Sequence, residues 1–241
     1  MDSESREFQP LERFQNQMLN LGVYHALYRA SEYIGGETWG DNFLAHTKLI
    51  ELIQEDNRKK EEEFRILLLG SATPTSIEQA LSAIEKWKTL GLIKDGKLTV
   101  VDLTSSGYDK LDPELKEKVE FVKMDVRRPA FKPGSFDFIT SDYLLNFIPQ
   151  GELASTISNL GTLLKHGGVF DATVDTKKRS LAGKMAGTFF VRNGLTKEQL
   201  DASVNNSSEY SLIEHQKARS RGLAKMSELG ADRIVWGFKR N

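Results

Sequence analysis

Cysteine is absent from the 241-residue chain, so disulfide bonds and thiolate metal sites are excluded. The four histidines are scattered without the paired spacing of metal ligands, and ordinary core or surface positions explain them better than metal binding. No apolar run reaches the roughly 18 residues that a membrane span needs. The polar first residues also lack the basic start and apolar core of a secretory signal. These absences predict a cytoplasmic protein without a metal site.

A strong charge excess is also missing, because the formal net charge is −1. The chain as a whole therefore has no pull toward nucleic acid or anionic lipid. The charges are unevenly distributed, with 13 Lys/Arg against 6 Asp/Glu in residues 176–241. Lys217, Arg221 and Lys225 form a stripe at helical spacing there. A solvated helix face is the favoured interpretation, and a surface for RNA or an acidic protein is the alternative.

What is present is a change of pattern near residue 64. Residues 8–60 show helical periodicity interrupted at Gly35-Gly36, which predicts an N-terminal helical lobe or lid over residues 1–63. Residues 64–241 alternate strands with helices, which predicts an α/β fold with a doubly wound, mostly parallel sheet. The predicted strands are 66–69, 98–101, 119–124, 136–140, 168–174 and 233–238, and the predicted helices are 76–90, 152–164 and 207–229.

The residues that follow the predicted strands suggest a ligand site. In a doubly wound sheet, ligands bind outside the carboxyl ends of the strands, where the strand order reverses. Carboxylates there can accept hydrogen bonds from ribose hydroxyls, and small residues let the backbone approach a ligand closely. Asp102 and Asp125 could instead cap the turns that follow them. Together the strand ends favour a ligand that contains a nucleoside. They carry Gly70, Ser71 and Ala72; Asp102 and Leu103; Asp125 and Val126; and Ser141, Asp142 and Tyr143.

Five stretches in sequence order resemble the class I S-adenosylmethionine-dependent methyltransferases. They are ILLLGSATP (66–74), LTVVDL (98–103), FVKMDV (121–126), SFDFITSDYLLNFIP (135–149) and LLKHGGVF (163–170). The resemblance covers about residues 64–175 and implies a Rossmann-like fold with S-adenosylmethionine as the cofactor. The turn departs from the family pattern, because a single Gly70 stands where two or three glycines are usual.

The resemblance also implies a role for each strand end. The turn at Gly70 would lie against the methionine part of the cofactor, Asp102 would hold the ribose, and Asp125 would lie near the adenine amino group. The stretch Ser141–Tyr143 would lie beside the transferable methyl group. Asp142 is the candidate for orienting or deprotonating the acceptor, and a helix cap is its alternative role. The predicted cofactor set is Gly70, Ser71, Ala72, Asp102, Leu103, Asp125, Val126, Ser141 and Tyr143.

The acceptor is less well defined by the sequence. Tyr24, Tyr28 and Trp39 in the N-terminal lobe are candidates for substrate contact, although packing is the favoured role of these aromatic residues. A small-molecule acceptor is the first hypothesis, and RNA or protein bound by the basic C-terminal stripe is the second. A binding module that kept the fold without catalysis is the third. A nicotinamide dehydrogenase is weaker because the G-x-G-x-x-G turn is missing, and aminopropyl transfer also stays open.

Overall fold

The computed structural model describes residues 42–55, 63–71, 73–142, 144–175, 195–205, 208–217 and 233–241. Their strands form one sheet of seven, flanked by helices. The strands are β1 (Phe64–Leu69), β2 (Gly96–Asp102), β3 (Val119–Lys123), β4 (Phe136–Asp142), β5 (Leu164–Asp175), β6 (Tyr210–Lys217) and β7 (Arg233–Arg240). The helices are α3 (Phe43–Glu55), α4 (Pro74–Thr89), α5 (Ser106–Asp109), α6 (Pro113–Lys116), η2 (Leu144–Phe147), α7 (Gln150–Thr162) and α9 (Lys197–Asn205).

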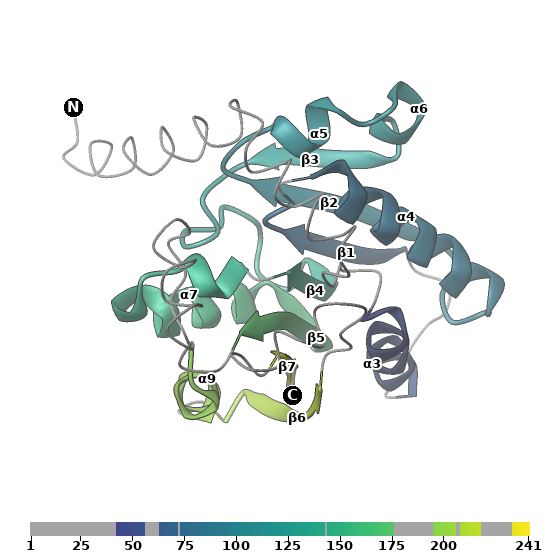
Figure 1. Cartoon of the computed structure of the whole chain (residues 1–241). Helices are drawn as coiled ribbons and strands as arrows, with labels where there is room; N and C mark the ends of the chain where they lie inside the picture. Colours follow the sequence, from purple (N-terminus) through teal and green to yellow (C-terminus); the bar gives the residue numbers. More distant parts are fainter. Residues whose placement is uncertain are drawn as a thin grey trace, which may run out of the picture.

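The strand order is β3-β2-β1-β4-β5-β7-β6 (Figure 1). Strands β1 to β5 pair in parallel, and β7 runs antiparallel between β5 and β6. Chain order runs outward from β1 through β2 to β3, and then returns to the other side of β1 with β4. The carboxyl ends of β1 and β4 therefore flank the reversal point of a doubly wound sheet. This topology confirms the predicted fold class.

The central strands are continuous apolar runs in the sequence, because helices cover both faces of the sheet. Helices α7 and α9 lie on one face, and α3 and α4 lie on the other (Figure 1). Successive residues of β1 alternate between the two cores: Leu67 and Leu69 face the α7 side, whereas Ile66 and Leu68 face the α4 side. This alternation fixes the register of the strand, since a shift by one residue would exchange the two faces.

Helix α3 belongs to the predicted N-terminal lobe, and it packs on the same core as the sheet. Ile50 and Ile53 are buried against the α4 side of the sheet. Trp87 of α4 donates from Nε1 to Thr47 Oγ1 at 2.9 Å, which joins the two helices. His46 is fully buried beside Asp171 of β5. The rest of the predicted lobe, and hence its lid role, lies outside the described residues.

The predicted helix over 207–229 is wrong across residues 210–217, which form β6. Pairing with β7 overrides the local helical pattern, because Leu212 and Ile213 lie opposite Phe238 and Gly237. The Tyr210 ring also packs edge-on against Phe238, with ring centroids 5.1 Å apart. Strands β6 and β7 therefore pair antiparallel at one end of the sheet, whereas the remainder of the predicted helix lies outside the described residues. Among the helices that the structure describes, none has the length and apolar character of a membrane span.

Candidate functional site

The carboxyl ends of β3, β2, β1 and β4 lie in one row. Leu69, the last residue of β1, pairs with Val101 on one side and Ser141 on the other. The amide of Met124 donates to the carbonyl of Asp102 at 3.0 Å, which holds the end of β3 against the end of β2. Asp125, Asp102, Gly70 and Ser141 therefore follow one another along a single edge. The structure thus brings together strand ends that are up to 71 positions apart in the sequence.

Gly70 makes the turn out of β1 in a conformation that favours glycine. Its φ is +73°, and its amide still donates to the carbonyl of Val101 at 2.8 Å. A Cβ at this position would lie 3.0 Å from Leu144 Cδ1. Glycine is therefore required both by the backbone angle and by the close approach of η2. The side of Gly70 where a Cβ would lie faces Leu144, which the sequence did not indicate.

Small polar residues follow Gly70 and lead into α4. Ser71 is buried, and its hydroxyl lies 3.4 Å from the carbonyl of Thr73. Thr73 occupies the N-cap position of α4 without making a side-chain cap bond. The first amides of α4 therefore have no capping side chain at Thr73, and they carry the positive end of the helix dipole. Ala72 lies outside the described residues.

Three hydroxyl groups at this edge are buried without a hydrogen-bond partner among the described residues. They are Thr73 Oγ1 after β1, Thr104 Oγ1 after β2 and Ser141 Oγ at the end of β4. Buried hydroxyls normally have a partner, and an unpaired one costs free energy. Their clustering at the reversal point of the strand order fits an edge that contacts a polar ligand.

Asp102 ends β2, and its carboxylate is fixed by the turn that follows. The amide of Thr104 donates to Asp102 Oδ1 at 2.9 Å. Burial raises the pKa of Asp102 from 3.8 to about 6, although hydrogen bonds from the amides of Thr104 and Leu103 act to lower it. The turn-cap role considered from the sequence is therefore real. A carboxylate has two oxygens with several lone pairs, so a turn cap at Asp102 is compatible with contact to a ligand.

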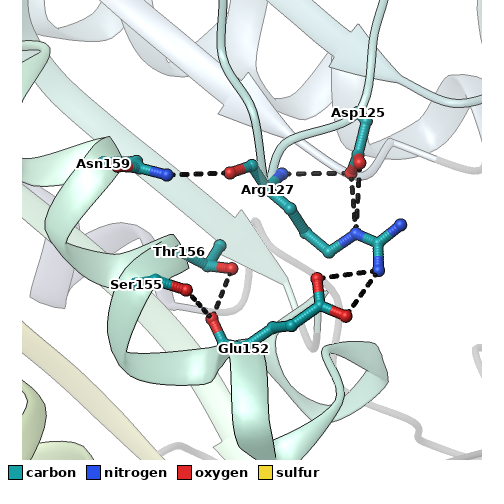
Figure 2. A network of polar contacts seen from close by, with 6 residues as sticks. All are labelled: Asp125, Arg127, Glu152, Ser155, Thr156 and Asn159. Carbon is teal, nitrogen blue, oxygen red and sulfur yellow. Dashed lines mark hydrogen bonds and ion pairs between the residues drawn. The ribbon is translucent and has the colours of Figure 1, made fainter. Parts of the chain in front are cut away.

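Asp125 is part of a polar network that the sequence does not indicate. Figure 2 shows Arg127 between Asp125 and Glu152, with Glu152 on α7. Arg127 Nε donates to Asp125 Oδ1 at 3.2 Å and Oδ2 at 3.1 Å, and Nη1 contacts the two Glu152 oxygens at 3.0 and 2.9 Å. The spacing of Asp125 and Arg127 could have indicated a local contact, but nothing in the sequence links either residue to Glu152.

The side chains of the remaining residues in the predicted cofactor set are less well placed to contact a ligand. Val126 is buried in the core on the α7 side, so its backbone rather than its side chain is available to the edge. Leu103 is partly buried directly after Asp102. Tyr143 lies outside the described residues, as do Tyr24, Tyr28 and Trp39. Within the described residues, no group of three or more His, Asp or Glu side chains could hold a metal ion.

Asp142 ends β4 next to the amino end of α3. It pairs in register with Thr173 of β5, and Asn42 Nδ2 donates to Thr173 Oγ1 at 3.4 Å. The chain that precedes Asn42 therefore joins the described fold beside Asp142. A single 3-10 turn, Leu144–Phe147, follows this end of β4, so Asp142 is not followed directly by a longer helix that it could cap.

Comparisons with known proteins agree with this geometry. Residues 82–168 match the family model described as a methyltransferase domain. A search of curated proteins found no match. Among solved structures, the chain is similar to 1,6-didemethyltoxoflavin-N1-methyltransferase from Burkholderia thailandensis, bound to 1,6-didemethyltoxoflavin and S-adenosylhomocysteine. The identity is 12%, the TM-score is 0.62, and the match covers 100% of this chain and 92% of the other.

Two further structures show the range of this fold. Geranyl diphosphate C-methyltransferase from Streptomyces coelicolor A3(2), with S-adenosylhomocysteine bound, is similar at 9% identity and a TM-score of 0.58, with 81% of each chain covered. The [4+2]-cyclase SpnF is similar at 14% identity and a TM-score of 0.54, with 80% of each chain covered. The family model and these solved structures agree with the strand order, so the chain has the Rossmann-like α/β fold of the class I methyltransferases.

Proposed function

We propose that this protein transfers a methyl group from S-adenosylmethionine to a small-molecule acceptor. The observation that carries the proposal is the row of Asp125, Asp102, Gly70 and Ser141 along the carboxyl edge at the reversal of strand order. Such an edge is where doubly wound sheets bind nucleotides. The methyltransferase neighbours with bound S-adenosylhomocysteine have small-molecule acceptors, which supports the same class here.

The cofactor would lie along this row. The Asp102 carboxylate would accept hydrogen bonds from the ribose hydroxyls, and Asp125 would accept one from the adenine amino group. The methionine part would lie along residues 70–73, where its carboxylate would face the amides at the start of α4. Thr73, Thr104 and Ser141 would then supply hydroxyl partners, which accounts for the buried hydroxyls of this edge.

The chemical step needs little from the protein beyond alignment. The sulfonium methyl is already activated, so a nucleophile can displace it in line when the reactants are held close and water is excluded. A general base is needed only if the acceptor carries a proton that must leave. Asp142 at the end of β4 is our candidate for orienting the acceptor or accepting that proton. Tyr24, Tyr28 and Trp39 are our candidates for contacting the acceptor, because aromatic rings supply large apolar contact area.

Calorimetry with S-adenosylhomocysteine tests the cofactor assignment. We expect the wild-type protein to bind, and we expect Asp102→Asn to bind at least tenfold more weakly, because one ionised acceptor of the ribose is lost. Asp112→Asn is the matched control, since Asp112 is exposed and precedes α6 away from the carboxyl edge. Equal affinity in the Asp102 and Asp112 variants would remove Asp102 from the site.

Two alternative functions can be distinguished from this proposal by experiment. A binding module without catalysis is favoured by the single-glycine turn and by the cyclase with the same fold. It predicts no thermal shift with S-adenosylmethionine or S-adenosylhomocysteine, and no methylated product from any acceptor in a panel. A macromolecular acceptor bound by Lys217, Arg221 and Lys225 predicts salt-sensitive binding that neutralising these residues weakens. Methylation of a small molecule by the purified protein would favour the first proposal over both.

A further inference from the structure

The side chain of Arg127 joins the end of β3 to α7 through two carboxylates (Figure 2). It is largely buried, with 18% of its side chain exposed, and Asp125 is similarly covered at 19%. Glu152 is more open at 46%. The more buried half of this network is therefore the contact of Arg127 with Asp125, at the carboxyl edge proposed to hold adenine.

We propose that Arg127 is a positioning residue that fixes the carboxylate of Asp125 for recognition of the adenine amino group, with Glu152 holding Arg127 in place. This inference rests on the proposed cofactor site. It adds a specificity role for two residues that lie outside the predicted site.

The geometry restrains the carboxylate in two ways. Arg127 Nε lies almost equally far from both oxygens, at 3.2 and 3.1 Å, so rotation of the carboxylate would break one contact. The amide of Arg127 also donates to Oδ1 at 3.0 Å. Oδ1 therefore accepts two hydrogen bonds, whereas Oδ2 accepts one and keeps a lone pair for a further donor.

Glu152 restrains the guanidinium group from the other side. Its two oxygens contact Arg127 Nη1, so the arginine side chain is held at Nε by one carboxylate and at Nη1 by another. Charge-assisted contacts of this kind are directional and stronger than neutral ones. The first turn of α7 thereby determines where the Asp125 carboxylate can point.

A separate contact already tethers the loop to α7. Asn159 Nδ2 donates to the backbone carbonyl of Arg127 at 2.9 Å (Figure 2). Removing the Asn159 amide would loosen the loop while leaving the arginine side chain between its two carboxylates. The chain therefore offers a matched control that separates tethering of the loop from orientation of the carboxylate.

The ligand chemistry supplies a sensitive readout. The adenine amino group donates a hydrogen bond, whereas the oxygen at the same position of hypoxanthine does not. A fixed carboxylate should favour S-adenosylhomocysteine over S-inosylhomocysteine by at least about tenfold, the usual worth of a hydrogen bond to a charged group. A carboxylate free to rotate would turn away from the hypoxanthine oxygen and discriminate less.

The test is calorimetry with both ligands on four purified proteins. They are the wild type, Arg127→Met, Glu152→Gln and Asn159→Ala, each checked for folding by circular dichroism. We expect the affinity ratio to fall below about threefold in Arg127→Met, to be intermediate in Glu152→Gln, and to equal the wild-type ratio in Asn159→Ala. If Arg127→Met does not fold, the reduced ratio in Glu152→Gln decides.

Two results would overturn the inference in different ways. Equal weakening of both ligands in Arg127→Met, with the ratio unchanged, would show that Arg127 only stabilises the loop. Failure of the wild type to bind either ligand would overturn the proposed cofactor site, and this inference with it. The wild-type measurement therefore separates the two failures.

Discussion

The buried contact between His46 and Asp171 provides the sharpest test of how α3 is held on the sheet. His46 Nδ1 lies 2.6 Å from Asp171 Oδ2, and 1% of each side chain is exposed. Asp171 Oδ1 has no hydrogen-bond partner among the described residues. The substitution His46→Leu would therefore leave the fully buried Asp171 carboxylate with no hydrogen-bond donor among the residues that the structure describes.

The expected loss in the free energy of unfolding follows from leaving the Asp171 carboxylate without its partner. Removing one partner of a buried pair typically costs about 3–5 kcal/mol, because the other is left uncompensated. Against a total stability of about 5–15 kcal/mol for a typical domain, this loss is large. Replacing both residues by apolar ones should cost less than the single change, since no isolated carboxylate remains. The double variant His46→Leu/Asp171→Val should therefore be more stable than His46→Leu.

Urea unfolding at fixed pH, followed by circular dichroism, measures these differences. His166→Leu serves as the control, because His166 is exposed and its ring Nδ1 lies 2.7 Å from the carbonyl oxygen of Asn241. We expect it to change stability by no more than about 1 kcal/mol. The reasoning fails if His46→Leu is as stable as the control, or if the costs of His46→Leu and Asp171→Val simply add in the double variant.

Other predictions address the carboxyl edge. The pKa of Asp102, about 6 in the folded protein against 3.8 in the unfolded chain, means that the folded state binds more protons between these values. Stability from this group should be greatest at low pH and should fall as pH rises through 6. Asp102→Asn should therefore stabilise the unliganded protein at pH 8, by up to about 3 kcal/mol, and give no gain near pH 4, which thermal unfolding at both values would show. Ionised Asp102 is the better ribose acceptor, so affinity for S-adenosylhomocysteine measured by calorimetry should fall as pH drops below 6. Gly70→Ala should lower the urea midpoint more than Gly134→Ala, because both have positive φ but only Gly70 would place a Cβ against Leu144; equal midpoints would contradict this. Gly151→Ala, in the first turn of α7 with open space around it, should raise the free energy of unfolding by about 0.4–1 kcal/mol, because alanine has less freedom than glycine in the unfolded chain.

Much of the sheet follows from local pattern. Apolar runs such as Ile66–Leu69 are too short for helices and lie between helical stretches, so the order of strands and helices could be predicted. Strand β6 could not, because its helical spacing is local, whereas the strand exists through pairing with β7. Long-range pairing of this kind overrides propensity without leaving a signal in the segment itself.

The candidate site likewise combines features that the local sequence predicts with features that depend on tertiary packing. The positions of Gly70 and Asp102 at the carboxyl edge were predictable, because Gly70 follows β1, Asp102 ends β2, and parallel strands end at a common edge. The bridge from Asp125 through Arg127 to Glu152 was not, since it depends on where α7 packs on the sheet. The contact of Leu144 with Gly70 likewise depends on the geometry of the turn after β4.

The close approach of Leu144 to Gly70 shows that the single glycine of this turn also has a packing role. The space that a Cβ would occupy at Gly70 lies against η2, so the glycine serves the packing of two strand ends as well as the turn. A ligand would instead approach the backbone after Gly70, where Ser71 and Thr73 have short side chains. Helix α4 begins there without a side-chain cap. A cofactor carboxylate needs backbone amides rather than glycine itself. A turn with a single glycine therefore still presents backbone amides and hydroxyl groups at the edge, where a ligand would contact them.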